Sequence, residues 1–284
     1  MNRRILSLLL LLVGTVFFGG YVFFFVSLDT SPDVLSVSFL DVGQGDAIFI
    51  TSPTGAQVLI DAGAGGAVFR ELARVMPYGD RTIDMVIATH PDMDHIGGFP
   101  EVFERYEVGM VIDPGIPHAT TPYQAFILSR DMEDAITYTA RRGMRFPIGG
   151  DAYIDILFPD RDVSGVDPND GSVIVQVVYG ATSFLLTGDA PQGVERWLVH
   201  LDGASLQSAV LKAGHHGSRT STHSDFLDTV RPHTVIISAG KDNQYGHPHR
   251  DVVHAIEEAG ASMVHTGEEG SIHFVSDGVS VKRK

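Results

Sequence analysis

The sequence contains no cysteine in 284 residues. Disulfide bonds and thiolate zinc sites are therefore both excluded, and any metal ion has to be bound through nitrogen and oxygen ligands. Positive charge is also scarce, because 20 Lys and Arg residues face 35 Asp and Glu residues and leave a formal charge of -15. Such a charge argues against broad electrostatic capture of nucleic acid. Internal repeats and low-complexity linkers are absent from the middle of the chain, which favours one large domain.

The N-terminal segment differs from the rest of the chain. Two arginines precede residues 5–28, a run with no ionisable side chain except Tyr21. A helix over such a run is about 36 Å long, which is enough to cross a bilayer. A cleaved secretory signal peptide is the alternative, but the run ends without the small-residue pattern of a cleavage site. We therefore predict an uncleaved, single-pass membrane anchor in residues 1–30 and one domain in residues 31–284. Because the arginines precede the span, the positive-inside tendency places the N-terminus in the cytoplasm and the domain outside it.

The densest group of metal-ligand candidates lies in the segment HPDMDH. His90, Asp92, Asp94 and His95 directly follow the apolar run of residues 83–88. That run is rich in β-branched residues and is typical of a buried strand. In α/β folds the chemistry usually lies where strands end, and imidazole and carboxylate packed this closely suit a divalent cation. A polar loop with incidental histidines is the alternative, and it is weakened by ligand candidates elsewhere in the chain.

Later strand ends supply these further candidates. Asp189 follows the apolar segment FLLTG, where the glycine lets backbone approach a ligand closely; alternatively, Asp189 caps the next helix. His215 and His216 stand between glycines after another strand, and the sequence does not indicate which of them would bind a metal. His247, in the segment YGHPH, would lie at the mouth of the site. It would contact a substrate oxyanion or protonate a leaving group, unless it is an ordinary polar residue before a helix.

Apolar alternation and helical periodicity predict the remaining elements. The predicted strands are residues 34–40, 47–51, 57–60, 83–88, 108–112, 153–158, 172–179, 183–187, 209–212 and 234–238. The predicted helices are residues 68–76, 99–106, 122–141, 191–200 and 249–259, and residues 262–281 are expected to form a closing hairpin. This order favours an α/β fold in which two sheets pack together with helices outside.

Several of these motifs together resemble a known family. The HxDxDH loop, LLTGD and LKAGHHGS are similar to the metallo-β-lactamase fold. More narrowly, FLDVGQGDA, HPDMDHIGG and YGHPH resemble the metallo-hydrolase domain of the ComEC family of competence proteins. The resemblance covers residues 35–274. It implies an αβ/βα four-layer sandwich, a centre of two divalent metal ions at the sheet edges, and hydrolysis of a phosphodiester or another ester. For the ComEC family it suggests a nuclease role in DNA uptake.

The resemblance also implies a ligand set, with two departures from the general pattern. Asp92 stands where the general motif HxHxDH has its middle histidine, and a later histidine ligand is missing near Asp170. One ion would be held by His90, Asp92, Asp189 and either Asp170 or Ser172. The other ion would be held by Asp94, His95, Asp189 and one of His215 and His216. Because carboxylate replaces imidazole, the first site favours Mn²⁺ or Mg²⁺ more than an all-histidine shell would, and Zn²⁺ also fits.

Roles in catalysis follow from this assignment. Asp189 would bridge two cations about 3.5–4 Å apart, and Asp94 would help to orient the attacking hydroxide. Substrate phosphate would be bound by four polar residues, each of which is otherwise an ordinary turn or surface residue: Ser218, Lys212, Arg219 and Lys241. Four residues in tight loops would orient the ligands without binding the metal: Asp41, Gln44, Asp46 and Asp61.

The sequence thus predicts a membrane-anchored, metal-dependent hydrolase, a phosphodiesterase or DNase of the ComEC type linked to DNA uptake or processing. Its partners would be a phosphodiester such as DNA, the cell membrane and components of a DNA-uptake channel. With one candidate span, the chain alone is not expected to transport DNA. One alternative is a hydrolase of a small ester, lactone or cyclic nucleotide, which the acidic composition favours. The other is a non-catalytic module that docks metal or DNA.

Overall fold

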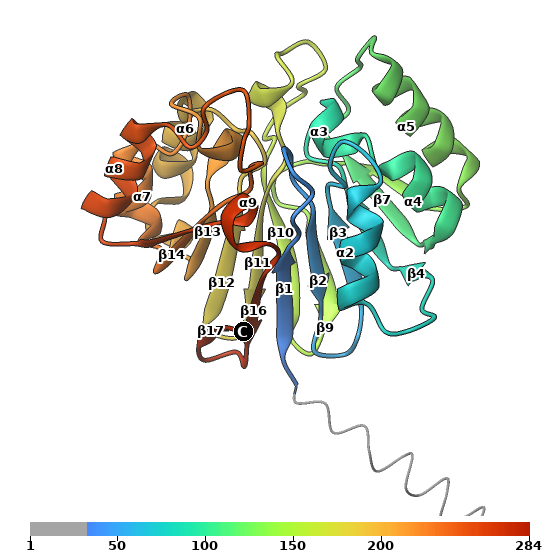
Figure 1. The fold of residues 1–284 in the computed structure, drawn as a ribbon, viewed down its shortest axis with the longest axis horizontal. Helices are drawn as coiled ribbons and strands as arrows, with labels where there is room; N and C mark the ends of the chain where they lie inside the picture. Colours follow the sequence, from blue (N-terminus) through green and yellow to red (C-terminus); the bar gives the residue numbers. More distant parts are fainter. Residues whose placement is uncertain (1–32) are drawn as a thin grey trace, which may run out of the picture. The chain divides into compact units, whose positions relative to one another are not determined.

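The computed structural model describes residues 33–284, and residues 1–32 lie outside the described part (Figure 1). The membrane anchor predicted for residues 1–30 falls within the part that is not described. Among residues 33–284, no helix combines the length and the apolar character that a bilayer span requires. Residues Val34–Lys284 form one compact unit.

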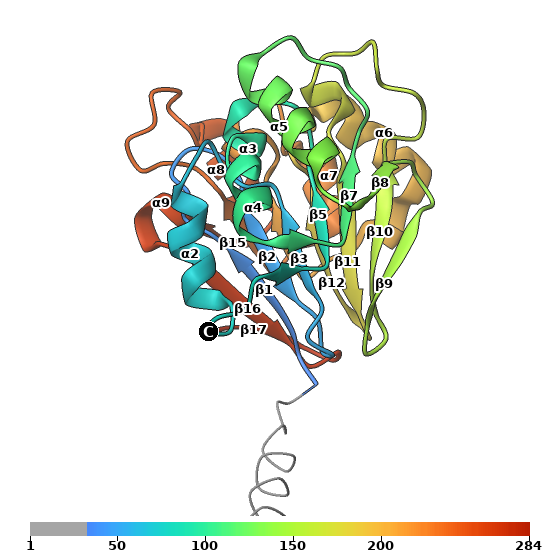
Figure 2. The same ribbon diagram turned by 90° about the vertical axis from the view of Figure 1, so that its right-hand side faces the viewer.

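Two β-sheets lie face to face in the centre of this unit (Figures 1 and 2). The first has the strand order β17-β16-β1-β2-β3-β5-β7-β8. Its strands are β1 (Leu35–Phe39), β2 (Ile48–Thr51), β3 (Gln57–Ile60), β5 (Met85–Ile87), β7 (Met110–Asp113), β8 (Ile136–Thr139), β16 (Ile272–Ser276) and β17 (Val281–Arg283). The second has the order β15-β14-β13-β12-β11-β10-β9. Its strands are β9 (Arg145–Gly149), β10 (Ala152–Phe158), β11 (Ile174–Tyr179), β12 (Thr182–Leu186), β13 (Val210–Lys212), β14 (Thr234–Ile237) and β15 (Ser262–His265).

Apolar side chains from both sheets fill the space between them. In β10 every second residue is buried, beginning at Ala152, and the residues between are only half-buried. This is the period of two that a strand imposes on its side chains. Contacts between the sheets are direct, because the rings of Phe184 in β12 and Phe274 in β16 lie edge to face with centroids 6.3 Å apart. The alternation in the sequence therefore produces the central core.

Helices cover the outer faces of both sheets (Figure 1). On the first sheet lie α2 (Ala67–Val75), α3 (Met93–Ile96), α4 (Phe99–Arg105) and α5 (Thr121–Met132). On the second lie α6 (Gln192–Asp202), α7 (Ser224–Val230) and α8 (Arg250–Glu258). The smaller elements are the ribbon of β4 (Thr82–Ile83) with β6 (Glu107–Val108), the short α9 (Thr266–Glu269), and the 3-10 turns η1 (Asn169–Gly171), η2 (Gly203–Leu206) and η3 (Gly214–Gly217). The layers of helix, sheet, sheet and helix confirm the predicted αβ/βα sandwich.

Parallel pairing brings the chemistry to one end of the sandwich. In the first sheet β3, β5 and β7 run parallel, and in the second β12, β13, β14 and β15 do so. Carboxyl ends of neighbouring parallel strands share one edge of a sheet, so the loops that follow them carry their side chains to one place. The loops after β3, β5, β12 and β13 hold most of the predicted site residues.

Three predicted elements differ from the structure. The helix predicted over residues 122–141 ends at Met132. The segment ITYT at Ile136–Thr139 forms β8 instead, since its β-branched and aromatic residues favour a strand and β7 offers a parallel partner. The hairpin predicted over residues 262–281 is also wrong in part. Only β16 and β17 form it, whereas β15 joins the second sheet beside β14. The strand predicted over residues 83–88 is shortened to β5, because Ile83 belongs to the separate ribbon.

Candidate metal centre

The loop after β5 carries four of the predicted ligands. His90 is buried just beyond the strand, and Asp92 precedes α3 in an extended conformation. The single turn of α3 then presents Asp94 and His95. The glycine-rich turn after β1 packs against this loop so closely that a Cβ on Gly45 would collide with the backbone oxygen of Asp94. The FLDVGQGDA segment therefore needs a glycine at this position to support the ligand loop.

The second sheet contributes three more of the predicted ligands. Asp189 lies buried just beyond β12, and His215 and His216 lie in the tight turn after β13. Both histidines have left-handed backbone conformations, with φ of 45° and 55°. Non-glycine residues enter this region at an energetic cost, and such strain is concentrated at functional sites. The two side chains are placed differently, because that of His216 is 2% exposed and that of His215 is 31% exposed.

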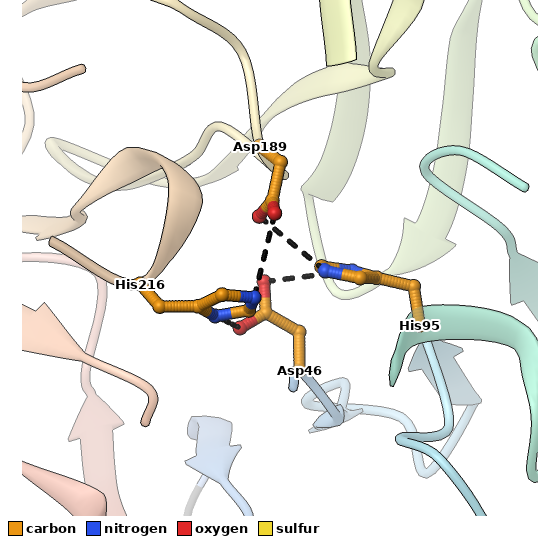
Figure 3. Close-up of side chains that lie close together, drawn as sticks. All are labelled: Asp46, His95, Asp189 and His216. Carbon is orange, nitrogen blue, oxygen red and sulfur yellow. Dashed lines mark ion pairs between the residues drawn. The ribbon is translucent and has the colours of Figure 1, made fainter. Parts of the chain in front are cut away.

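The Nε2 atoms of four histidines converge on the carboxylate of Asp189. Those of His95 and His216 lie 3.4 Å from Oδ1 and Oδ2 of Asp189, respectively (Figure 3). Those of His90 and His215 each lie 3.9 Å from Oδ2. Side chains from both sheets thus meet around one carboxylate at the end of the sandwich.

Two further carboxylates lie on the open side of this cluster. Asp94 Oδ2 is 3.2 Å from His216 Nε2, and Asp92 Oδ2 is 3.6 Å from His90 Nε2. Their side chains are 33% and 38% exposed, respectively, whereas His90 is buried. Solvent therefore reaches the centre past Asp92 and Asp94.

The opposite ring nitrogens of the buried histidines are fixed by other groups. His95 Nδ1 lies 2.7 Å from Asp61 Oδ2, and His90 Nδ1 lies 3.0 Å from Thr89 Oγ1. His216 Nδ1 lies 2.8 Å from the carbonyl oxygen of Ser238, which can only accept a hydrogen bond. Partners of this kind orient a histidine and leave its Nε2 lone pair available for a metal ion.

The donor set fits a divalent cation. The Nε2 atoms of His90 and His95 are buried and have no hydrogen-bond partner in the described part of the chain. A buried polar atom without a partner is costly, and a bound cation would satisfy both atoms. Imidazole nitrogen and carboxylate oxygen at such spacing are ligands of zinc, manganese and related ions.

Asp46 belongs to the same buried cluster, but it lies on the other side of the rings. With His95, Asp189 and His216 it forms a group of close ligand atoms (Figure 3). Its oxygens face Nδ1 of His95 at 3.9 Å and Nδ1 of His216 at 3.6 Å, whereas Asp189 faces their Nε2 atoms. Asp46 Oδ2 also lies 2.5 Å from Lys212 Nζ. This arrangement favours the supporting role predicted for Asp46 over direct binding of a metal.

The structure places Lys212 in neither of the two ways predicted for it, as a contact to substrate phosphate or as an ordinary surface charge. Its side chain is fully buried, and its ammonium donates to the carbonyl oxygen of Gly188 at 2.8 Å. The same nitrogen lies 3.4 Å from Asp189 Oδ1. The prediction is wrong because Lys212 is the last residue of β13 and points inward, where it compensates the charges of Asp46 and Asp189.

The charges of the centre stabilise one another. Burial alone would raise the pKa of Asp189, but His216, His95 and Lys212 lower it well below its usual range. Burial lowers the pKa of His95 and His216, but neighbouring carboxylates more than offset this, raising the pKa of His95 well above its usual value and that of His216 to about 9. Despite burial, hydrogen bonding from His216 keeps the pKa of Asp94 far below its usual value. A metal ion has to displace the histidine protons, so metal affinity will increase with pH.

The two residues predicted to replace the missing histidine lie in different places. The side chain of Asp170 is exposed and has no recorded contact with the other predicted ligands in the described residues. Ser172 is fully buried, and its Oγ accepts a hydrogen bond from the backbone N–H of Asp189 at 3.3 Å. Of the two, only Ser172 contacts the centre, where it positions the backbone of Asp189.

The other predicted substrate contacts, Ser218, Arg219 and Lys241, lie in loops that follow strands of the second sheet. Ser218 is buried in the turn and accepts a hydrogen bond from Thr220 Oγ1 at 3.0 Å. Arg219 and Lys241 are exposed, and the structure records no ion pair for either of them among residues 33–284. Arg219 is next to Ser218 and directly follows the turn of the histidine pair.

His247 is half-buried, and its ring centroid lies 5.7 Å from that of His215. Burial and the neighbouring His249 lower the pKa of His247 to about 4. The neutral imidazole keeps one N–H that can bond a substrate oxygen. It carries no imidazolium proton at neutral pH, so the predicted role of proton donor to a leaving group is not favoured.

The loops predicted to support the ligands do so to different degrees. Asp61 contacts His95 directly and accepts hydrogen bonds from the backbone and hydroxyl of Thr89. Gln44 accepts a hydrogen bond from the backbone of Gly240 at 3.4 Å and so connects two loops near the mouth. Asp41 accepts one from the backbone of Gly43 and shapes its own turn without a recorded contact to a predicted ligand.

Glu195 supports the site and was not found from the sequence. It lies fully buried in α6 and accepts hydrogen bonds from the backbone N–H groups of Thr222 and His223 at 2.6 Å and 2.9 Å. These bonds fix the segment that follows the histidine pair. Burial raises the pKa of Glu195 to about 7. In the sequence Glu195 is one of two acidic residues on this helix, and nothing distinguishes it from a surface charge.

Comparison with known proteins agrees with this geometry. Residues 40–241 match the model of the metallo-beta-lactamase superfamily. ComE operon protein 3 of Bacillus subtilis is 28% identical over 84% of this chain and 32% of its own length. Competence protein ComA of Neisseria gonorrhoeae is 29% identical over 84% of this chain and 32% of its own length. The chain thus spans about a third of the curated relatives it matches. The resemblance to competence proteins that the motifs indicated is confirmed.

The fold also has a counterpart among solved structures. Igni18, a metallo hydrolase from Ignicoccus hospitalis, superimposes with a TM-score of 0.55 at 14% identity. The match covers 84% of this chain and 98% of that protein. At this identity the likeness shows the fold alone.

Proposed function

This chain belongs to the metallo-beta-lactamase superfamily, and we propose that it is a phosphodiesterase with two divalent metal ions that cleaves DNA. Membership of the superfamily indicates a metal-dependent hydrolase; the substrate and the number of ions are part of the proposal. The observation that carries it is the convergence of four histidine Nε2 atoms on Asp189, with carboxylates on the open side. The similarity to a protein named for competence supports DNA as the substrate.

The residues would divide between two positions that share Asp189. His95, His216 and Asp94 would hold one ion, since both of these histidines lie 3.4 Å from Asp189 and His216 lies 3.2 Å from Asp94. His90 and Asp92 would hold the other, with the partly exposed His215 beside them. When bound, the ions would lower the pKa of a water molecule and offset the charge of the phosphoryl group.

The chain's own groups would bind and orient the substrate. Asp94 stays ionised and partly exposed, so it can accept a hydrogen bond from the attacking water and fix its direction. His247 can donate its N–H to a phosphoryl or leaving oxygen, and Arg219 can pair with a neighbouring phosphate. Lys212 keeps Asp189 in place from the buried side.

The proposal includes the location of the domain. An anchor in residues 1–30 would hold the domain at the outer face of the cytoplasmic membrane, where entering DNA and components of an uptake channel would be its partners. The support for this is the apolar composition of that segment, with arginines before it.

The test uses the full chain, stripped of metal and then supplied with Mn²⁺ or Zn²⁺. Single- and double-stranded DNA and bis-p-nitrophenyl phosphate serve as substrates. Metal-dependent DNA cleavage should be lost in Asp189→Ala and Asp94→Ala, and it should persist in Asp170→Ala, whose side chain is exposed.

Two other outcomes would replace the proposal. Cleavage of the small ester alone would indicate a small-molecule phosphodiesterase, which the formal charge of -15 favours. Metal binding without turnover of any substrate would leave a docking module as the function.

A further inference from the structure

We infer that Tyr245 forms an aromatic platform at the mouth of the metal centre, on which a nucleobase of the substrate stacks. The inference rests on the proposed phosphodiesterase function and names the part of the substrate that is recognised beside the phosphate. Tyr245 is 57% exposed and lies two residues before His247. An exposed aromatic side chain alone is ordinary, so the inference depends on what surrounds it.

A row of rings connects Tyr245 to the centre. Its ring stacks on that of His247 with centroids 5.7 Å apart and planes inclined by 23°. His247 in turn lies 5.7 Å from the ring of His215, whose Nε2 faces Asp189. A base stacked on the outer end of this row would have its phosphate directed toward the ligands.

The loop that carries Tyr245 is held rigidly. Asn243 donates from its side-chain amide to the carbonyl oxygens of Gly240 and His247 at 2.8 Å and 2.7 Å, and its Oδ1 accepts from the backbone of His247 at 2.9 Å. The backbone of His249 bonds that of Gly217 at 2.9 Å, which connects the loop to the turn of the histidine pair. A side chain presented on an ordered loop loses little conformational entropy when a ligand binds.

A second apolar side chain is exposed in the ligand loop. Met93 is 56% exposed and stands between Asp92 and Asp94. A thioether makes favourable contacts with aromatic rings, so Met93 adds apolar surface to the loop that carries Asp92 and Asp94. Tyr245 and Met93 belong to loops of the two different sheets, and both loops reach the centre.

Charge makes such a platform useful. With a formal charge of -15, the chain attracts a polyanion weakly over long distances. Base stacking on aromatic side chains does not depend on that attraction and tolerates any sequence. The substrate class is therefore single-stranded or frayed nucleic acid, whose bases are free to stack.

The test compares two oligomers of equal length and equal phosphate charge. One is oligothymidylate, and the other has abasic tetrahydrofuran units in place of every nucleoside. Cleavage by the Mn²⁺-loaded full chain and equilibrium binding by fluorescence anisotropy are both measured. The wild type should favour oligothymidylate. Tyr245→Ala should weaken binding of oligothymidylate and raise its KM by about ten-fold, the scale of one stacked base, with kcat and the abasic oligomer unaffected.

Two variants serve as controls. Tyr245→Phe keeps the ring and should behave like the wild type, whereas Tyr78→Ala removes a fully exposed ring outside the site loops and should change nothing. If Tyr245→Ala leaves the preference for oligothymidylate unchanged, or if the wild type has no such preference, the platform does not exist. If the wild type binds with a preference that depends on Tyr245 but cleaves neither oligomer, the platform stands and the proposed hydrolase fails.

Discussion

Replacing Lys212 with methionine should destabilise the metal-free protein strongly. The ammonium of Lys212 lies within 2.5 Å of Asp46 Oδ2, 2.8 Å of the carbonyl oxygen of Gly188 and 3.4 Å of Asp189 Oδ1. Methionine has a similar length and no charge, so it would leave two buried carboxylates without this cation. Removing one partner of a buried ion pair costs about 3–5 kcal/mol. Because most domains are stable by about 5–15 kcal/mol, this is a large share of the total.

The free energy of unfolding would be measured by urea titration, monitored by circular dichroism. Lys241→Met removes an exposed lysine and should change it by less than about 0.5 kcal/mol. Combining Lys212→Met with Asp46→Asn removes the cation together with one of its carboxylates, and should recover part of the loss. Mn²⁺ should stabilise the Lys212→Met protein by binding beside Asp189. If the free energy of unfolding of Lys212→Met lies within about 1 kcal/mol of that of the wild type, the buried ammonium does not stabilise Asp46 and Asp189.

Three further predictions concern the surroundings of the centre. Because folded Glu195 keeps its proton up to about pH 7 and the unfolded chain loses it near pH 4.5, its contribution makes the wild type less stable as pH rises through this interval. Between pH 4 and pH 8, urea titrations should show a decrease in the free energy of unfolding that is about 3 kcal/mol larger in the wild type than in Glu195→Gln. Equal decreases would refute the raised pKa of Glu195. Asp61→Asn should weaken Mn²⁺ binding, measured by calorimetry, by about 10- to 100-fold, and Asp170→Asn should leave it unchanged; comparable losses would contradict the support that Asp61 gives to the ligands. Elemental analysis should count fewer Mn²⁺ ions per chain in His216→Ala than in His215→Ala. The reverse order would contradict His216 as the more important ligand of the pair.

Local sequence was sufficient for the parts of the site that depend on one loop. The HPDMDH segment and the HHG turn follow apolar runs directly, and a strand followed by polar residues and glycine predicts a site at a strand end. A role for Asp61 at the site could also be predicted, because Asp61 directly follows a strand in the same way. The αβ/βα architecture followed from the order of strands and helices, together with the resemblance of the motifs.

The rest depended on contacts between residues far apart in the chain. Nothing in the segment LKAG indicates that Lys212 turns inward, because the reason is Asp46, in the loop between β1 and β2 of the other sheet. His216 is buried and His215 is partly exposed in a turn that contains two left-handed residues in succession, which no propensity predicts. The end of α5 depends on β7, since a parallel partner makes a strand of residues that would otherwise continue a helix.

The pairing of β1 affects how the domain can be synthesised. β1 lies between β2 and β16, and its register with β16 runs from Leu35 opposite Ser276 to Phe39 opposite Ile272. Until residues 272–276 leave the ribosome, β1 has one row of unpaired backbone groups next to apolar side chains. An open apolar edge of this kind pairs readily with other chains. A chain shortened before Ile272 would therefore aggregate instead of forming a smaller active domain, and the first sheet can close only after residues 272–276 have been translated.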